Sequence, residues 1–198
     1  MYSRHRTHFF GLLSAPRIEW QSIREETTDL TQFRLIRLAF FAAIPAISFF
    51  IGLTYVGWSL SGSEFNKMPM DSAFMMSIAF YALIIVATFL MAYFTFITEK
   101  SIAEEASFKR CLLFVCYTAT PMFMAGLVGF LPIVWLCVLV LVAAVHYSLY
   151  LLYIGIPIYM DIPEGKSFMI IGSVVTAGLC MMLSFVIAVL IIMKNLMV

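Results

Sequence analysis

Five long runs of apolar residues dominate the chain, and the polar residues are confined almost entirely to the segments between those runs. A helix needs about 20 mostly apolar residues to cross the hydrocarbon core of a bilayer, and each run reaches roughly that length. No water is available there, so the backbone must satisfy its own hydrogen bonds, and the runs lack the alternation typical of barrel strands. The pattern therefore predicts an all-α integral membrane protein with spans at residues 35–56, 73–97, 112–130, 132–156 and 168–193.

Prolines mark the bends expected within and between the third and fourth spans. The two runs together are too long for one crossing, so we expect a tight antiparallel hairpin around Phe130–Leu131–Pro132. Pro132 suits the first turn of a helix, where its missing N–H costs little. The ring of Pro121 conflicts with the carbonyl of Tyr117, which predicts a kink there, with the hydroxyl of Thr120 nearby.

The segment before the first span has the pattern of an amphipathic helix rather than of a plain tail. Pro16 can open a helix, and apolar or small residues then recur at helical spacing, at Trp20, Ile23, Thr27 and Leu30. Two placements fit this pattern equally well. The helix can lie in the membrane interface with Trp20 at headgroup level, or it can pack under the bundle without a lipid role. The predicted division is therefore a cytoplasmic segment, 1–34, and a five-helix domain, 35–198.

Composition excludes a water-soluble domain. Hydrophobic residues make up 63% and charged residues 12% of the chain, whereas soluble domains are about half apolar and about a quarter charged. The mean hydropathy is +1.01. The net charge of +1 gives no basic field for nucleic acid. The four cysteines lie in apolar runs without a CxxC pair, so we expect small buried side chains rather than a disulfide framework or zinc site.

The distribution of Lys and Arg predicts the orientation. Basic residues gather before the first span and in the loops after the second and fourth spans: Arg4, Arg6, Arg17, Arg24, Arg34, Arg37, Lys100, Lys109, Arg110 and Lys166. The other side has only Lys67 and Lys194. Basic loops stay on the cytoplasmic side, so we expect the N-terminus in the cytoplasm and, after five crossings, the C-terminus outside.

Ionisable residues deep in a membrane are candidates for function, and His146 is the clearest one here. A proton relay would need a carboxylate or a second histidine close by, and no carboxylate lies within the five predicted apolar cores. We therefore favour a neutral histidine that is hydrogen-bonded to a neighbouring helix. No nucleophile with a base and no cluster of metal ligands is apparent, so neither an enzyme nor a cofactor or metal site is predicted.

The end of the fourth span carries a second group of candidates. Tyr153 belongs to a set of tyrosines typical of a membrane interface, and Gly155 and Pro157 are expected to bend or end the helix before a loop with Asp161. These residues either anchor the helix and form a turn, or contribute to a cytoplasmic binding surface. That surface would be shared with the N-terminal segment and the 100–110 loop.

Three stretches, SAPRIEWQSIREE, YTATPMFMAGLVGFLPIVW and LYLLYIGIPIYMDIPEGKS, occur in this order. They resemble the Yip (Ypt-interacting protein) membrane family, and in particular its YohC-like branch in the bacterial inner membrane. The resemblance implies five membrane helices and a cytoplasmic N-terminus. Eukaryotic members act in vesicle trafficking and associate with prenylated small GTPases and with each other. Bacteria lack that trafficking system, so the role is not carried across. The positions that match the family pattern are Pro16, Trp20, Tyr117, Thr120, Pro121, Tyr153, Gly155, Pro157 and Asp161.

Two function classes follow from these features. The leading hypothesis is a non-enzymatic inner-membrane scaffold that organises lipids or partner proteins. Its expected partners are membrane lipids, a second copy of the chain, and an unidentified membrane or cytoplasmic protein, but not nucleic acid. The alternative is a channel or transporter for a small solute or ion, in which an oligomer could widen the path. Its lining would come from Tyr117, Thr118, Thr120, His146, Ser148 and Tyr150.

Overall fold

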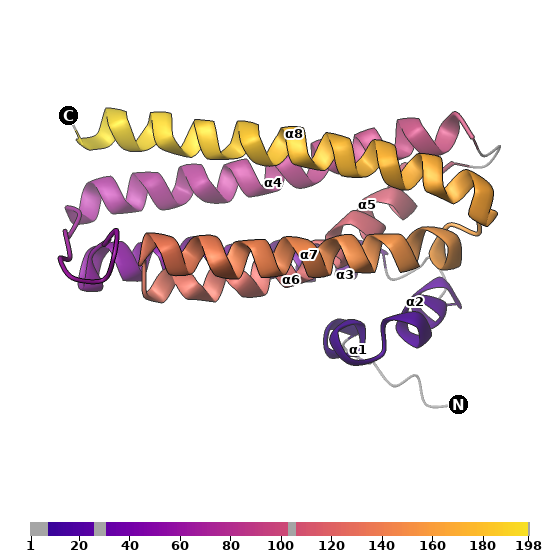
Figure 1. Cartoon of the computed structure of the whole chain (residues 1–198), viewed down its shortest axis with the longest axis horizontal. Helices are drawn as coiled ribbons and strands as arrows, with labels where there is room; N and C mark the ends of the chain where they lie inside the picture. Colours follow the sequence, from indigo (N-terminus) through magenta and orange to yellow (C-terminus); the bar gives the residue numbers. More distant parts are fainter. Residues whose placement is uncertain (1–7, 26–30, 103–105, 198) are drawn as a thin grey trace.

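The computed structural model describes residues 8–25, 31–102 and 106–197. Within these ranges the chain is helical apart from its connections and two isolated β-bridges (Figure 1). The elements are α1 (His8–Ser14), α2 (Pro16–Glu25), α3 (Thr31–Ile51), the π-helix η2 (Gly52–Val56), α4 (Met70–Lys100), α5 (Phe108–Thr118), α6 (Thr120–Ala125), the 3-10 helix η3 (Gly126–Phe130), α7 (Val134–Tyr159) and α8 (Glu164–Met197).

Five helical segments are long and apolar enough to cross a membrane, as the sequence predicts. They are Ala39–Val56, Met70–Lys100, Phe108–Phe130, Val134–Tyr159 and Gly165–Ile192. The third is built from α5, α6 and η3, and it breaks at Ala119, next to the predicted kink at Pro121. The second continues three residues beyond the predicted range at each end, which brings Glu99 into the helix. The fourth begins at Val134, so Pro132 precedes the helix instead of opening it.

The bundle has two groups of helices. Helices α4 and α8 run side by side, and α3, α6 and α7 form the other group, with α5 reaching between them (Figure 1). Helix α3 and η3 approach so closely that only glycine fits at the contact. A Cβ on Gly129 would lie 2.9 Å from the backbone N of Phe49. The hydroxyl of Ser48 donates a hydrogen bond of 2.5 Å to the carbonyl of Gly126 and fixes this contact.

The two ends of the bundle differ in construction. We call the end that holds α1, α2, the start of α5 and the last turns of α7 the α2 end; the last turns of α8 lie at the opposite end (Figure 1). At the opposite end, the backbone of Ser59 pairs with Pro132 and Val134 and ties the loop before α4 to the start of α7. Helix α2 begins at Pro16, as predicted, whereas Thr27 and Leu30 lie outside the described residues.

The cysteines follow the expectation in part. Among the described residues all four are free thiols. Cys111 and Cys116 are buried as expected, but Cys180 is exposed on the outer face of α8. A membrane helix has an apolar outer face as well as an apolar inner face, so an apolar run alone does not predict burial inside the protein.

Candidate functional site

Four aromatic side chains from three separate parts of the sequence meet at the α2 end, and we call them the aromatic cluster. The indole of Trp20 lies 5.0 Å from the ring of Phe114, 6.4 Å from Tyr117 and 5.5 Å from Tyr159, measured between centroids. Phe114 and Tyr159 are themselves stacked at 5.8 Å. Trp20 is 0% exposed, so its placement at headgroup level is wrong, and α2 is instead packed against the bundle. Contact with three rings removes more apolar surface from water than an interfacial position would.

Gly155 makes this contact sterically possible. A Cβ on Gly155 would lie 2.6 Å from Cε2 of Phe114 and 2.8 Å from Cε2 of Trp20. Helix α7 continues through Gly155 and Pro157 to Tyr159, so these residues do not end the helix, and the alternative that they bend it stays a prediction. Pro157 lies in the last turns, where its missing N–H removes a single helical hydrogen bond, and the packing of α2 supports the turn.

Polar contacts hold the N-terminal helices in place. Arg24 donates two hydrogen bonds to the carboxylate of Asp161, at 2.6 and 3.1 Å, and a third to the carbonyl of Ile158 at 3.0 Å. Asp161 has a φ of 57°, in the left-handed region that Asp adopts more often than most residues. The Tyr147 hydroxyl donates to the carbonyl oxygens of Leu12 and Leu13, at 3.1 and 3.0 Å. We call α1 and α2, held in this way, the N-terminal clasp.

A buried carboxylate, which the sequence analysis did not identify, lies near the clasp. Glu99, in the last turn of α4, is 0% exposed and forms an ion pair with Arg110 of α5. The thiol of Cys111 donates to its second oxygen at 2.9 Å. The predicted second span ends at Ile97, which places Glu99 in the loop that follows it. Arg110, eleven residues further along, was the one sequence feature that could have indicated a partner.

The residues proposed as a channel lining do not come together. His146 lies exposed on the outer face of α7, and within the described residues it makes no hydrogen bond to a neighbouring helix, so that expectation is wrong. Tyr150 and Tyr153 are exposed as well. The Thr118 and Thr120 hydroxyls donate to carbonyl groups of their own helical turns, those of Phe114 and Cys116. Only Thr118 and Ser148 of the proposed set border the interior cavity described next.

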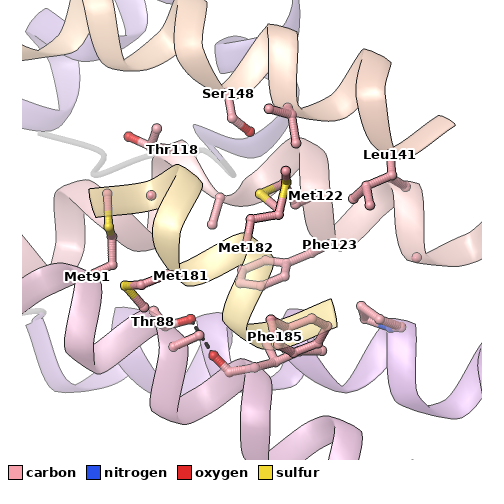
Figure 2. A pocket seen from close by; sticks show the side chains of 18 of the residues that line it. Thr88, Met91, Thr118, Met122, Phe123, Leu141, Ser148, Met181, Met182 and Phe185 are labelled. Carbon is pink, nitrogen blue, oxygen red and sulfur yellow. Dashed lines mark hydrogen bonds between the residues drawn. The ribbon is translucent and has the colours of Figure 1, made fainter. Parts of the chain in front are cut away.

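An apolar cavity of about 470 Å³ lies between the helices, and α3, α4, α5, α6, α7 and α8 all contribute to its wall (Figure 2). Among the described residues, no charged side chain lines it, and four methionines do: Met91, Met122, Met181 and Met182. Thr88 and Thr118 border it, but their hydroxyls already donate to the backbone of their own helices. The Ser148 hydroxyl is buried, has no hydrogen-bond partner among the described residues, and points into the cavity (Figure 2).

Comparison with known proteins places this architecture in a family. The Yip1 domain matches residues 10–185. The chain belongs to the Yip1 family. It is 34% identical over 164 residues to the inner membrane protein YohC of Escherichia coli K12, and equally to that of strain O6:H1, which covers 82% of this chain and 84% of each relative. No solved structure matches it.

Most of the site residues predicted from the family resemblance converge at the α2 end. Trp20, Tyr117 and Gly155 contact one another directly or through Phe114. Pro16 opens α2, Pro121 begins α6 beside the buried Thr120, and Asp161 binds Arg24. Tyr153 and His146 lie apart from them on the exposed face of α7. In the described part of this Yip1 chain, no three His, Cys, Asp or Glu side chains are grouped so that they could hold a metal ion.

We expect Gly155→Ala to destabilise the protein by about 1–2 kcal/mol, because the overpacking against two rings exceeds the helical gain from removing a glycine. The measurement is thermal unfolding of the purified protein in one detergent. Gly172→Ala on α8 is the matched control, since a Cβ there meets nothing within 4 Å. The control should be neutral or slightly stabilising. Equal effects of the two substitutions would contradict the close contact at Gly155.

Proposed function

We propose that this Yip1 chain is a non-enzymatic scaffold of the bacterial inner membrane that organises membrane lipids within and around its helix bundle. The observation that carries the proposal is the apolar interior cavity, whose wall has no charged side chain in the part of the chain that the structure describes. Such a space favours hydrocarbon and disfavours ions, since a charge in an apolar setting without a partner is very unfavourable.

The proposed location and orientation have separate support. The relatives are named as inner membrane proteins. Exposed basic residues occur at the α2 end, at Arg17, Arg24, Lys100, Lys109 and Lys166. Because basic segments stay on the cytoplasmic side of a membrane, we propose that the α2 end lies in the cytoplasm and the end of α8 outside. Self-association and a protein partner stay predictions.

A channel receives less support. Its proposed lining is dispersed between the outer face of α7, backbone-bonded hydroxyls and the apolar cavity. A hydrophilic passage would need hydroxyl or charged groups that face one another along the bundle. Among the described residues, the cavity wall offers only three hydroxyl groups, those of Thr88, Thr118 and Ser148.

The lipid-organising function predicts a selected lipid environment. The full chain would be extracted with its surrounding bilayer into polymer-bounded discs, and the lipids of these discs would be compared with those of discs from the whole membrane. We expect at least one lipid class to be enriched with the protein. Identical compositions would contradict the proposal. So would solute flux into phosphatidylethanolamine–phosphatidylglycerol proteoliposomes that Thr120→Ala or Ser148→Ala abolishes.

A further inference from the structure

We infer that the interior cavity is a binding site for one hydrocarbon chain of a membrane lipid, which enters along α8 and presents an uncharged oxygen to the Ser148 hydroxyl. The inference rests on the proposed lipid-organising function, and it adds that the scaffold holds one lipid hydrocarbon chain inside the bundle. It concerns the space between the helices, whereas the lipids that surround the bundle would contact its outer faces.

The size and the wall of the cavity suit a single chain. If a methylene group is given the roughly 30 Å³ that one water molecule occupies in the liquid, 470 Å³ holds on the order of 15 methylene groups. Apolar cavities of this size lie in the range of pockets that bind small hydrophobic molecules. The methionines in the wall have flexible, polarisable side chains, which adapt to a chain without one fixed shape.

Ser148 supplies the polar contact. Hydroxyl side chains on neighbouring helices, such as Thr88, Thr95 and Thr118, each donate to the carbonyl four residues earlier. Ser148 makes no such bond, although it is only 9% exposed and its oxygen is buried. A buried hydroxyl without a partner is unfavourable, so its orientation into the cavity indicates a ligand with an acceptor. An ester carbonyl oxygen is such an acceptor, and it carries no charge.

The route of entry follows from exposure. The residues of the wall are buried or half-buried, except for Leu179, Val186 and Leu190, which are exposed. All three belong to α8, so the cavity opens to the surroundings along this helix. In a bilayer those surroundings are lipid chains, and a lipid can therefore enter sideways without crossing a polar surface. Helix α8 contacts α4 at Gly178 and at Phe185, which packs on Phe80 at 5.4 Å.

The test is photocrosslinking of the full chain in phosphatidylethanolamine–phosphatidylglycerol nanodiscs. One probe is a phosphatidylethanolamine with a diazirine in one ester-linked acyl chain, a second is the matching diacylglycerol, and a third is the ether-linked phospholipid without the carbonyl. Labelled residues are mapped by mass spectrometry. We expect labelling of cavity residues such as Met122 and Met181, and the first two probes distinguish a phospholipid from a neutral lipid as the source of the chain.

Two variants on α8 provide the comparison. Gly178→Leu places a side chain in the cavity, since a Cβ at Gly178 lies 3.4 Å from Cε of Met91, whereas Gly172→Leu points into open space. The leucine displaces about two methylene groups of a bound chain, so cavity labelling should fall by about tenfold in Gly178→Leu and stay unchanged in Gly172→Leu. Both variants lose a helical glycine, so the change in helix propensity is matched, and monodispersity on a sizing column checks that each is folded.

Ser148→Ala tests the hydroxyl. It should reduce labelling by the ester probes severalfold to the level of the ether probe, and leave the ether probe unaffected. Lack of cavity labelling in the wild-type protein would overturn the inference, as would labelling that Gly178→Leu does not reduce. Protein–protein crosslinks between α8 of one copy and the cavity residues of another copy would also overturn the inference, because a second protein chain would then fill the cavity. Lipid enrichment in discs without cavity labelling would contradict this site and leave the proposed function standing.

Discussion

Trp20→Ala is expected to release the N-terminal clasp and to cost about 3–5 kcal/mol, the usual range for truncating a fully buried tryptophan. The indole is 0% exposed and contacts three rings, so its removal leaves a cavity beside Phe114, Tyr117 and Tyr159. Leu12 and Ile23 of the clasp are also buried in the apolar core, but their side chains are smaller than the indole. The exposed pair of Arg24 and Asp161 stabilises by no more than about 1 kcal/mol. The measurement is the rate of limited proteolysis within residues 8–25, together with thermal unfolding in detergent.

Ile18→Ala is the matched control on the same helix. Ile18 is 68% exposed, so its truncation should change stability by less than about 0.5 kcal/mol. If both variants are cleaved at the wild-type rate, Trp20 does not hold the clasp in place. If both are cleaved rapidly, the change in helix α2 itself, and not the buried indole, is responsible.

The five spans were predictable because their physical cause is local. A run of about 20 apolar residues forms a membrane-spanning helix because of the thickness of the bilayer and the need for internal backbone hydrogen bonds. Neither cause depends on distant residues. The break at Ala119 was predictable for the same reason, since Pro121 lacks an N–H wherever its helix packs. The start of α2 at Pro16 likewise follows from a local preference for proline in the first turn.

The direction in which each side chain faces was not predictable. Helix α7 is apolar on all sides, so periodicity does not distinguish its inner face from its outer face. His146 therefore could not be assigned to the exposed face, nor Ser148 to the cavity wall. The contact between Gly155 and Trp20 joins residues more than a hundred positions apart, and only the packed structure brings them together.

The burial of Glu99 was not predictable for a different reason. Its place next to the second span is clear from the sequence, but its burial depends on residues of another helix. A carboxylate two residues beyond a predicted span is normally solvated, since burial of a charge is unfavourable without a partner. Here α4 continues to Lys100, and Arg110 and Cys111 on α5 supply a cation and a thiol donor. The ion pair therefore couples the end of α4 to the start of α5.

Arg110→Met is expected to destabilise the protein by about 3 kcal/mol, because it leaves the buried Glu99 carboxylate without its cation. The lower end of the usual range applies, since the Arg110 side chain is 34% exposed and solvent weakens the pair. The measurement is equilibrium or thermal unfolding of the purified protein in a fixed detergent. Lys109→Met is the control, because the neighbouring Lys109 is exposed and its replacement should be close to neutral.

The double variant Glu99→Leu with Arg110→Met separates the pair from the packing around it. Removal of both charges avoids the unpaired carboxylate, so the double variant should be more stable than Arg110→Met alone. It should also be less destabilised than the sum of Glu99→Leu and Arg110→Met, by a coupling energy of about 1–3 kcal/mol. The thiol of Cys111 then loses its acceptor, which is a small cost because a thiol is a weak donor. If the double variant is as unstable as the sum of its single changes, the carboxylate and the guanidinium do not act as a pair. If Arg110→Met is as mild as Lys109→Met, the buried charge is compensated by another group.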